Sequence, residues 1–127
     1  MSTFRISLGI ATIAGGLLFS TMAQAHPKLL SSEPQANTQA VSPEKIELHF
    51  SEALVAQFSG AKLLMTGMPG MTHPPMAVDV NVSGGKDSKT MVITPAKPLM
   101  TGAYRVEWRA VSSDTHPVTG KLSFEVK

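Results

Sequence analysis

Apolar and polar residues alternate along several short segments of the chain. Residues 46–51 read Ile-Glu-Leu-His-Phe-Ser, so that every second side chain is apolar. The same period of two recurs in 61–66, 78–83, 104–110 and 121–126. Successive side chains on a strand point to opposite faces, so this period is typical of half-buried β-strands. Residues 28–33 and 90–94 are weaker strand candidates.

Clusters of glycine, proline, serine and threonine separate these segments. They predict turns, at 83–85, 95–98, 101–102 and 119–120. No stretch has a convincing helical period, and residues 52–58 could form one turn at most. About seven short strands separated by turns predict an all-β domain, a small Greek-key barrel or sandwich, with an immunoglobulin-like arrangement as one form of it.

The first 25 residues have a different character from the rest. Arg5 is their only charged residue, and Ile6–Phe19 is almost entirely apolar. This stretch is shorter than the ~20 residues that a membrane-spanning helix needs, but it suits the apolar core of a secretory signal peptide. Ala23-Gln24-Ala25 has the small-x-small pattern of a cleavage site. We expect residues 1–25 to be a cleaved signal peptide, with an uncleaved anchor as the alternative, and 26–127 to be one exported domain.

The composition argues against nucleic-acid binding and against a membrane-embedded domain. The formal net charge is only +2 and no run of basic residues occurs, so nucleic-acid binding has no support. No later segment is apolar enough to span a membrane, so the exported domain is not expected to be membrane-embedded. The chain has no cysteine. A soft metal ion would therefore have to be held by methionine and histidine.

Residues 65–76 concentrate methionine, since they contain four of the eight methionines in the chain. Their glycines and prolines exclude a stable helix and predict a surface loop. Flexible core filling or a docking surface for a partner are two ordinary uses of such methionines. A surface loop would not expose four methionines without a reason. Thioether sulfur is a soft ligand that suits Cu(I), so we favour a metal site over these two uses. The candidate Cu(I) ligands are Met65, Met68, Met71, His73 and Met76.

Cleavage after Ala25 would make His26 the first residue of the mature chain. An N-terminal histidine offers an imidazole and a free α-amine to one metal ion. Pro27 has no amide proton, so its nitrogen cannot become a third ligand. Further ligands must come from elsewhere in the fold.

Asp114 and His116 lie two positions apart after the strand that contains Trp108. In an extended segment, side chains at i and i+2 point the same way and could face one metal ion. Alone, this pair is more typical of a turn that the aspartate caps, with a solvated histidine. Together with His26 it predicts a Cu(II) site, in which Asp114 is a ligand, a weak ligand or the holder of a water molecule.

Two further residues, His49 and Glu52, have side chains that can bind a metal ion. His49 lies on the polar face of its segment beside Glu47, and we expect a hydrogen-bonded or exposed surface histidine. Glu52 is a candidate outer carboxylate near the metal.

These motifs together resemble the periplasmic copper-resistance protein C family (CopC, also called PcoC). The resemblance rests on His26-Pro27, the methionine segment and the run Trp108–Pro117. It implies a Greek-key barrel similar to cupredoxins and a periplasmic, non-enzymatic copper carrier of a Gram-negative bacterium. It also implies Cu(II) at His26, Asp114 and His116, Cu(I) at the methionine segment, and exchange with a multicopper oxidase and an inner-membrane copper transporter.

Two other functions are alternatives to a copper carrier. An N-terminal histidine with a second histidine also builds the copper site of oxidative polysaccharide monooxygenases, but such an enzyme has no use for the methionines. The second alternative is an adhesion or chaperone module of immunoglobulin type that binds no metal. The chain is expected to be a monomer or a metal-bridged dimer.

Overall fold

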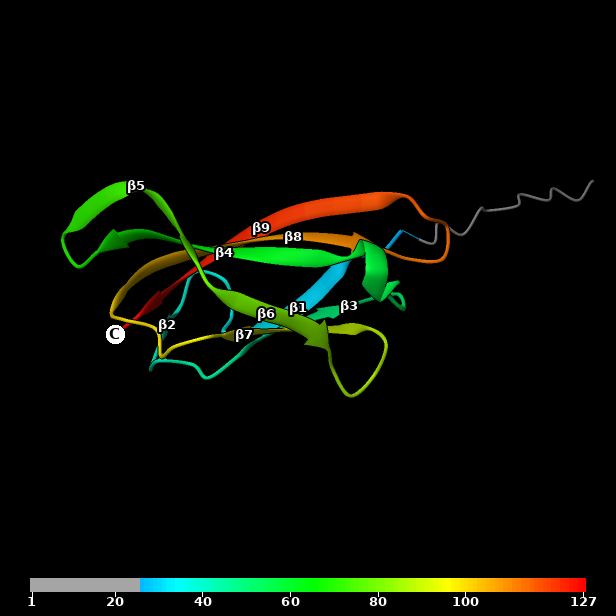
Figure 1. Cartoon of the computed structure of the whole chain (residues 1–127), viewed down its shortest axis with the longest axis horizontal. Coiled ribbons are helices and arrows are strands. Elements are labelled where there is room, and N and C mark those ends of the chain that lie inside the picture. Colours follow the sequence, from blue (N-terminus) through cyan, green and yellow to red (C-terminus); the bar gives the residue numbers. More distant parts are fainter. Residues whose placement is uncertain (1–25) are drawn as a thin grey trace, which may run out of the picture.

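Two β-sheets pack face to face in the protein (Figure 1). The computed structural model describes residues 26–127, so the expected signal peptide lies outside the described residues. One sheet has the strand order β1 (Leu29–Glu33), β3 (Ile46–Phe50), β7 (Thr90–Pro95), β6 (Val80–Gly84). The other has the order β2 (Gln39–Ala40), β9 (Pro117–Val126), β8 (Gly102–Val111), β4 (Gly60–Met68), β5 (Met71–Val78). A single 3-10 turn, η1 (Ala56–Phe58), is the sole helical element of residues 26–127. The predicted all-β class is confirmed.

The alternating pattern places one apolar face of each sheet in a shared core. Ile46, Leu48 and Phe50 of β3 are 2% exposed or less. Trp108 of β8 packs against this face from the other sheet. Its ring meets the Phe50 ring edge-on at a centroid distance of 5.1 Å. Removing such apolar surface from water is the main stabilising term for a domain of this size. Among residues 26–127, no helix is long and apolar enough to cross a membrane.

The methionine segment is a hairpin rather than a loop, so that expectation is wrong. Residues 71–78 form β5, which pairs with β4 through a tight turn at Pro69-Gly70. Gly70 has a φ of 75°, a conformation that glycine adopts without strain. Pro74 and Pro75 are tolerated in β5 because it is an edge strand with one side free of ladder hydrogen bonds.

Residues 119–120 are also not the turn that their composition suggested. β9 runs through them without a break, and Gly120 lies opposite Trp108 in the β8–β9 ladder. A Cβ atom at Gly120 would lie 2.3 Å from the Trp108 ring. The lack of a side chain at Gly120 therefore lets the Trp108 ring lie against the backbone of β9.

The two predicted metal-binding regions lie at opposite ends of the sandwich. The β4–β5 hairpin projects at one end, where the connection between β7 and β8 also lies (Figure 1). The connection between β8 and β9 and the start of the described chain lie at the other end.

Candidate metal centre

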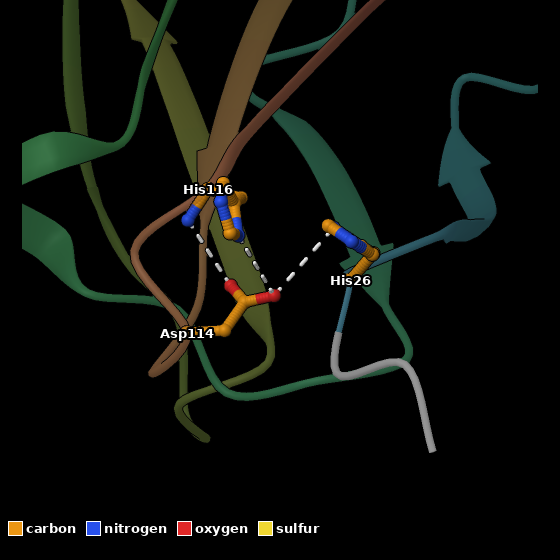
Figure 2. Close-up of side chains that lie close together, drawn as sticks. All are labelled: His26, Asp114 and His116. Atoms are coloured by element: carbon orange, nitrogen blue, oxygen red, sulfur yellow. Dashed lines mark hydrogen bonds and ion pairs between the residues drawn. The ribbon is translucent and has the colours of Figure 1, made fainter. Parts of the chain in front are cut away.

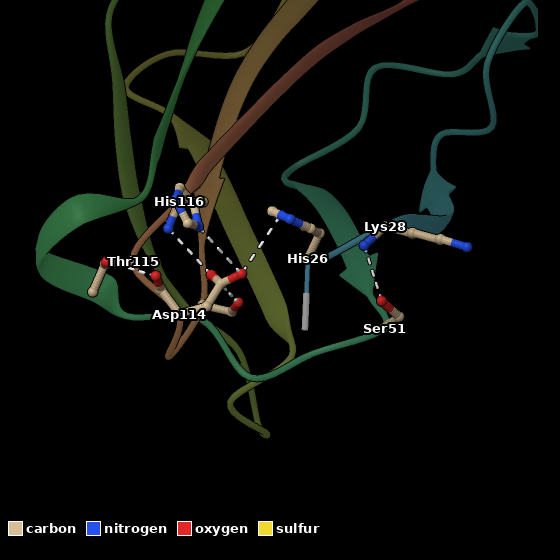
Figure 3. A network of polar contacts seen from close by, with 7 residues as sticks. His26, Lys28, Ser51, Asp114, Thr115 and His116 are labelled. Atoms are coloured by element: carbon tan, nitrogen blue, oxygen red, sulfur yellow. Dashed lines mark hydrogen bonds and ion pairs between the residues drawn. The ribbon is translucent and has the colours of Figure 1, made fainter. Parts of the chain in front are cut away.

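The chain before β1 is fixed by burial and by hydrogen bonds. Pro27 is fully buried beside His26. The Lys28 N–H donates to Ser51 Oγ at 2.9 Å, and the Ser51 N–H donates to the Lys28 carbonyl at 2.9 Å (Figure 3). These contacts hold the backbone next to His26 against the end of β3. Sequence analysis did not single out Ser51, and no motif around it indicates this role.

The connection between β8 and β9 is a turn, not the extended segment that the spacing suggested. Thr115 has a φ of 62° and its N–H donates to the Ser112 carbonyl at 2.9 Å. Asp114 Oδ1 accepts from the His116 N–H at 3.1 Å and from Ser112 Oγ at 3.2 Å. The aspartate therefore caps its own turn and is fixed in place by it.

This turn brings both predicted ligands to His26. Asp114 Oδ2 lies 3.5 Å from His26 Nδ1 and 3.7 Å from His116 Nδ1 (Figure 2). The two imidazole rings are 5.6 Å apart between centroids. One ligand atom from each of the three residues lies within 4.8 Å of the others. Within the described part of the chain, no other group of three histidine, aspartate or glutamate side chains has its ligand atoms this close together.

Solvent can reach the cluster. The side chains of His26, Asp114 and His116 are 42%, 25% and 72% exposed. The hydrogen bond from the His116 N–H, helped by Ser112 and the two histidines, lowers the pKa of Asp114 below its ordinary 3.8. A metal ion would therefore meet a charged carboxylate without first displacing a proton.

Two imidazoles and one carboxylate are a donor set suited to Cu(II). The Nδ1 atom of His26 faces Asp114, and this is the ring nitrogen that can share a metal with the α-amine of the same residue. If the chain begins at His26, three nitrogens and one oxygen would be available, which matches the four-coordinate tetragonal preference of Cu(II).

His49 and Glu52 lie outside this cluster. The Nδ1 atom of His49 is 3.2 Å from Thr90 Oγ1 and its Nε2 atom is 3.8 Å from Glu47 Oε1. His49 thus has the hydrogen-bonded surface environment that was expected. Glu52 follows Ser51 directly and is half-buried.

The methionines at the other end differ in exposure. Met68, Met71 and Met76 are 45%, 60% and 58% exposed, whereas Met65 is 6% exposed and belongs to the core. Met68 lies opposite Met71 beside the hairpin turn, and Met65 lies opposite Met76. The hairpin therefore presents three of the predicted thioethers to solvent and keeps the fourth inside.

His73 adds a nitrogen donor to the hairpin. Its Nδ1 atom lies 2.8 Å from the Pro74 carbonyl and must donate to it, because a carbonyl oxygen can only accept. In that tautomer Nε2 carries a lone pair. It is buried and has no hydrogen-bond partner in the structure of residues 26–127. An unpaired buried nitrogen of this kind is a suitable metal ligand.

The protein is thus a two-sheet β-sandwich with candidate metal ligands at both ends. The CopC domain family matches residues 29–127, and the chain belongs to this family. Two relatives are named copper resistance protein C. The one from Pseudomonas syringae pv. tomato is 64% identical over 118 residues, which is 93% of this chain and 94% of the relative. The one from Escherichia coli is 56% identical over 123 residues, which is 94% and 98%.

Solved structures agree with this assignment. The structure of PcoC, a methionine-rich copper resistance protein from Escherichia coli, has a TM-score of 0.77 and 59% identity, and the match covers 81% of this chain and 100% of that one. The structure of CopC from Methylosinus trichosporium OB3b has a TM-score of 0.67 and 26% identity, covering 80% and 94%. The chain is therefore related to copper resistance proteins in sequence and in fold.

Proposed function

We propose that this protein binds copper in the periplasm and sequesters or carries it, with a Cu(II) site at one end and a Cu(I) site at the other. The Cu(II) ligands are the α-amine and imidazole of His26, the imidazole of His116 and the carboxylate of Asp114. The Cu(I) ligands come from the hairpin, namely Met65, Met68, Met71, His73 and Met76. The protein is a carrier and not an enzyme.

The convergence of His26, Asp114 and His116 carries this proposal. Residues from the start and the end of the domain meet with ligand atoms within 4.8 Å of one another. The carboxylate is held charged by its turn, and the backbone beside His26 is held by Ser51. An arrangement fixed in this way before metal arrives reduces the ordering cost of binding.

The exposed hairpin supports the Cu(I) half. Three thioethers at the surface and the free Nε2 of His73 are soft or borderline donors, which Cu(I) prefers to oxygen. Oxidised copper would then be held by nitrogen and oxygen, and reduced copper by sulfur. Oxidation of bound Cu(I) to Cu(II), with the electron taken up by the multicopper oxidase that the family resemblance implies, would shift the favoured site from the sulfur end to the nitrogen end. Copper could then pass between sites or between molecules without release as a free ion.

The proposal includes export and processing. Removal of residues 1–25 would create the free α-amine of His26 that the Cu(II) site needs. In the periplasm the carrier would exchange copper with a multicopper oxidase and an inner-membrane copper transporter, as the family resemblance implies. It would act as a monomer or as a metal-bridged dimer.

The first experiment tests the α-amine. One glycine is inserted before His26 of the processed protein, and Cu(II) affinity is measured by competition titration. We expect affinity to fall about tenfold or more, since even groups that only support a metal ligand typically contribute this much. A glycine added after Lys127 is the matched control and should change nothing. Equal affinity in the two variants would show that the site does not need the α-amine on His26 itself.

A second experiment tests the thioethers. Met68, Met71 and Met76 are replaced together by leucine, which keeps their volume but removes sulfur. Because all three are exposed, the fold should be unaffected, while Cu(I) affinity should fall by orders of magnitude. Replacing the buried Met91 by leucine is the control. Unchanged Cu(I) affinity in the triple variant would place the site elsewhere.

A further inference from the structure

Met100 is a methionine that the proposed copper sites do not use. It lies in the connection between β7 and β8, and its side chain is 60% exposed. That connection is at the same end of the sandwich as the β4–β5 hairpin (Figure 1). The neighbouring Leu99 is 6% exposed and packs in the core, so Leu99 anchors the connection while Met100 faces solvent.

The strand register connects Met100 to the hairpin methionines. The Tyr104 hydroxyl donates to the Met100 carbonyl at 2.7 Å. Tyr104 lies directly opposite Met65 in the β8–β4 ladder, and Met65 lies opposite Met76 in the β4–β5 ladder. Directly opposed side chains in antiparallel strands have Cβ atoms about 5 Å apart. Tyr104, Met65 and Met76 therefore form one row across the sheet. The Tyr104 hydroxyl, at the end of this row, holds the backbone of Met100.

The buried methionine and the exposed one line a common cavity of about 190 Å3. Met65 and Met100 both line it, together with Tyr104 and Asp79. Gly102 makes room for Met65 at the inner side, because a Cβ atom at Gly102 would lie 2.6 Å from the Met65 methyl carbon. Met65 therefore contributes to the wall of the same cavity as Met100, although Met65 is almost completely buried.

We propose that Met100 is an additional thioether ligand, and that Met65 and Met100 together form a binding subsite for a soft monovalent metal ion beside the hairpin. A d10 ion such as Cu(I) or Ag(I) accepts a small number of neutral sulfur ligands. The subsite offers one thioether that is fixed by the core and one that can move in solvent. Met76, next in the row, would allow the ion to pass between the subsite and the hairpin. The proposal rests on the proposed function of the hairpin and extends its ligand set.

The test uses Ag(I) as a redox-inert substitute for Cu(I). The exported protein is labelled with 13C at its methionine methyl groups and titrated with Ag(I), and each methyl resonance is followed by NMR. We expect the Met100 and Met65 resonances to shift along with those of Met68, Met71 and Met76. The Met91 resonance is the internal control and should stay in place, since Met91 is 3% exposed and lies on β7 in the other sheet.

The matched variant is Met100→Leu, which preserves an apolar side chain at an exposed position. We expect a loss of Ag(I) affinity of about tenfold, the lower end of the effect typical for groups that support a metal site. An unmoved Met100 resonance, or an unchanged affinity of Met100→Leu, overturns the proposal. If the hairpin resonances still move, the proposed Cu(I) site stands without Met100. If they do not move either, the Cu(I) half of the proposed function is wrong as well.

Discussion

Asp114 and Asp87 have the same local role in two different turns, which makes them a matched pair. Each accepts a backbone N–H from two residues further along the chain, His116 and Lys89 respectively. Of the two, only Asp114 also lies beside His26. Asp114→Asn should retain the turn, because the amide oxygen can still accept, but it removes a charged metal donor. We predict about a tenfold or greater loss of Cu(II) affinity for Asp114→Asn.

The control for that prediction is Asp87→Asn, which alters a turn in the same way away from His26. Its Cu(II) affinity, measured by the same competition titration, should equal that of the unmodified protein. Equal losses in both variants would mean that Asp114 acts through the turn alone and is not a ligand.

The two carboxylates also make stability depend on pH. Hydrogen bonds lower the pKa of Asp87 below 3.8, as they do for Asp114. A carboxyl group with a lowered pKa in the folded state stabilises the fold above its unfolded value and loses this contribution as pH falls through the folded value. We predict that the free energy of unfolding of the metal-free protein decreases as pH falls below about 4.

Urea unfolding at a series of pH values, followed by the fluorescence of Trp108, measures this effect. Asp87→Asn removes one of the titrating groups and should flatten the decrease. The same pH dependence in Asp87→Asn as in the unmodified protein would contradict the assignment of Asp87.

At the level of the strands, Gly120 tests how closely β8 and β9 approach each other. A Cβ atom there would overlap the Trp108 ring, which is wedged against Phe50. Gly120→Ala should therefore destabilise the fold by about 1–3 kcal/mol, the usual cost of overpacking a core. Gly60→Ala is the control, because a Cβ atom at Gly60 meets nothing within 4 Å. Chemical denaturation of both variants measures the difference, and equal stability would show that Trp108 can move away without cost.

The strands differ in how well the sequence predicts them. β3 and β8 alternate cleanly because each has one face in the core, and their inner faces follow directly from the pattern. β5 was missed because it is an exposed edge strand that contains Pro74 and Pro75, so neither alternation nor composition indicates it. β2 has only two residues, too few for a period.

The candidate site was predictable in its residues but not in its geometry. His26 follows from the cleavage pattern, and Asp114 and His116 follow from residue type, although the extended segment that their spacing suggested is a turn. Their approach depends on the positive φ of Thr115 and on the contacts of Ser51, which lies far away in the chain. Such long-range contacts leave no local periodic signal. The burial of Met65 does follow from the alternation of 61–66, which places it on the apolar face of a strand. The pairing of Met65 with the exposed Met76 was not readable, because β5 itself was not predicted.

At the scale of the whole molecule, the two candidate sites occupy opposite ends of one sandwich (Figure 1). They have no ligand in common, and the core of both sheets lies between them. Sites that are far apart and share no partners usually contribute independently. The protein should therefore hold one ion of each type at the same time, with little effect of one on the affinity for the other.

The final prediction is that Cu(II) and Ag(I) stabilise the protein additively. An ion that binds only the folded state, at a free concentration 100 times its Kd, adds about 2.7 kcal/mol to the free energy of unfolding. For a domain of this size that corresponds to a rise in Tm of about 10 °C or more. Thermal unfolding followed by circular dichroism, with each ion alone and with both, measures the two contributions. Their sum is expected for the doubly loaded protein, whereas a rise no larger than that of one ion would mean that both ions compete for a single site.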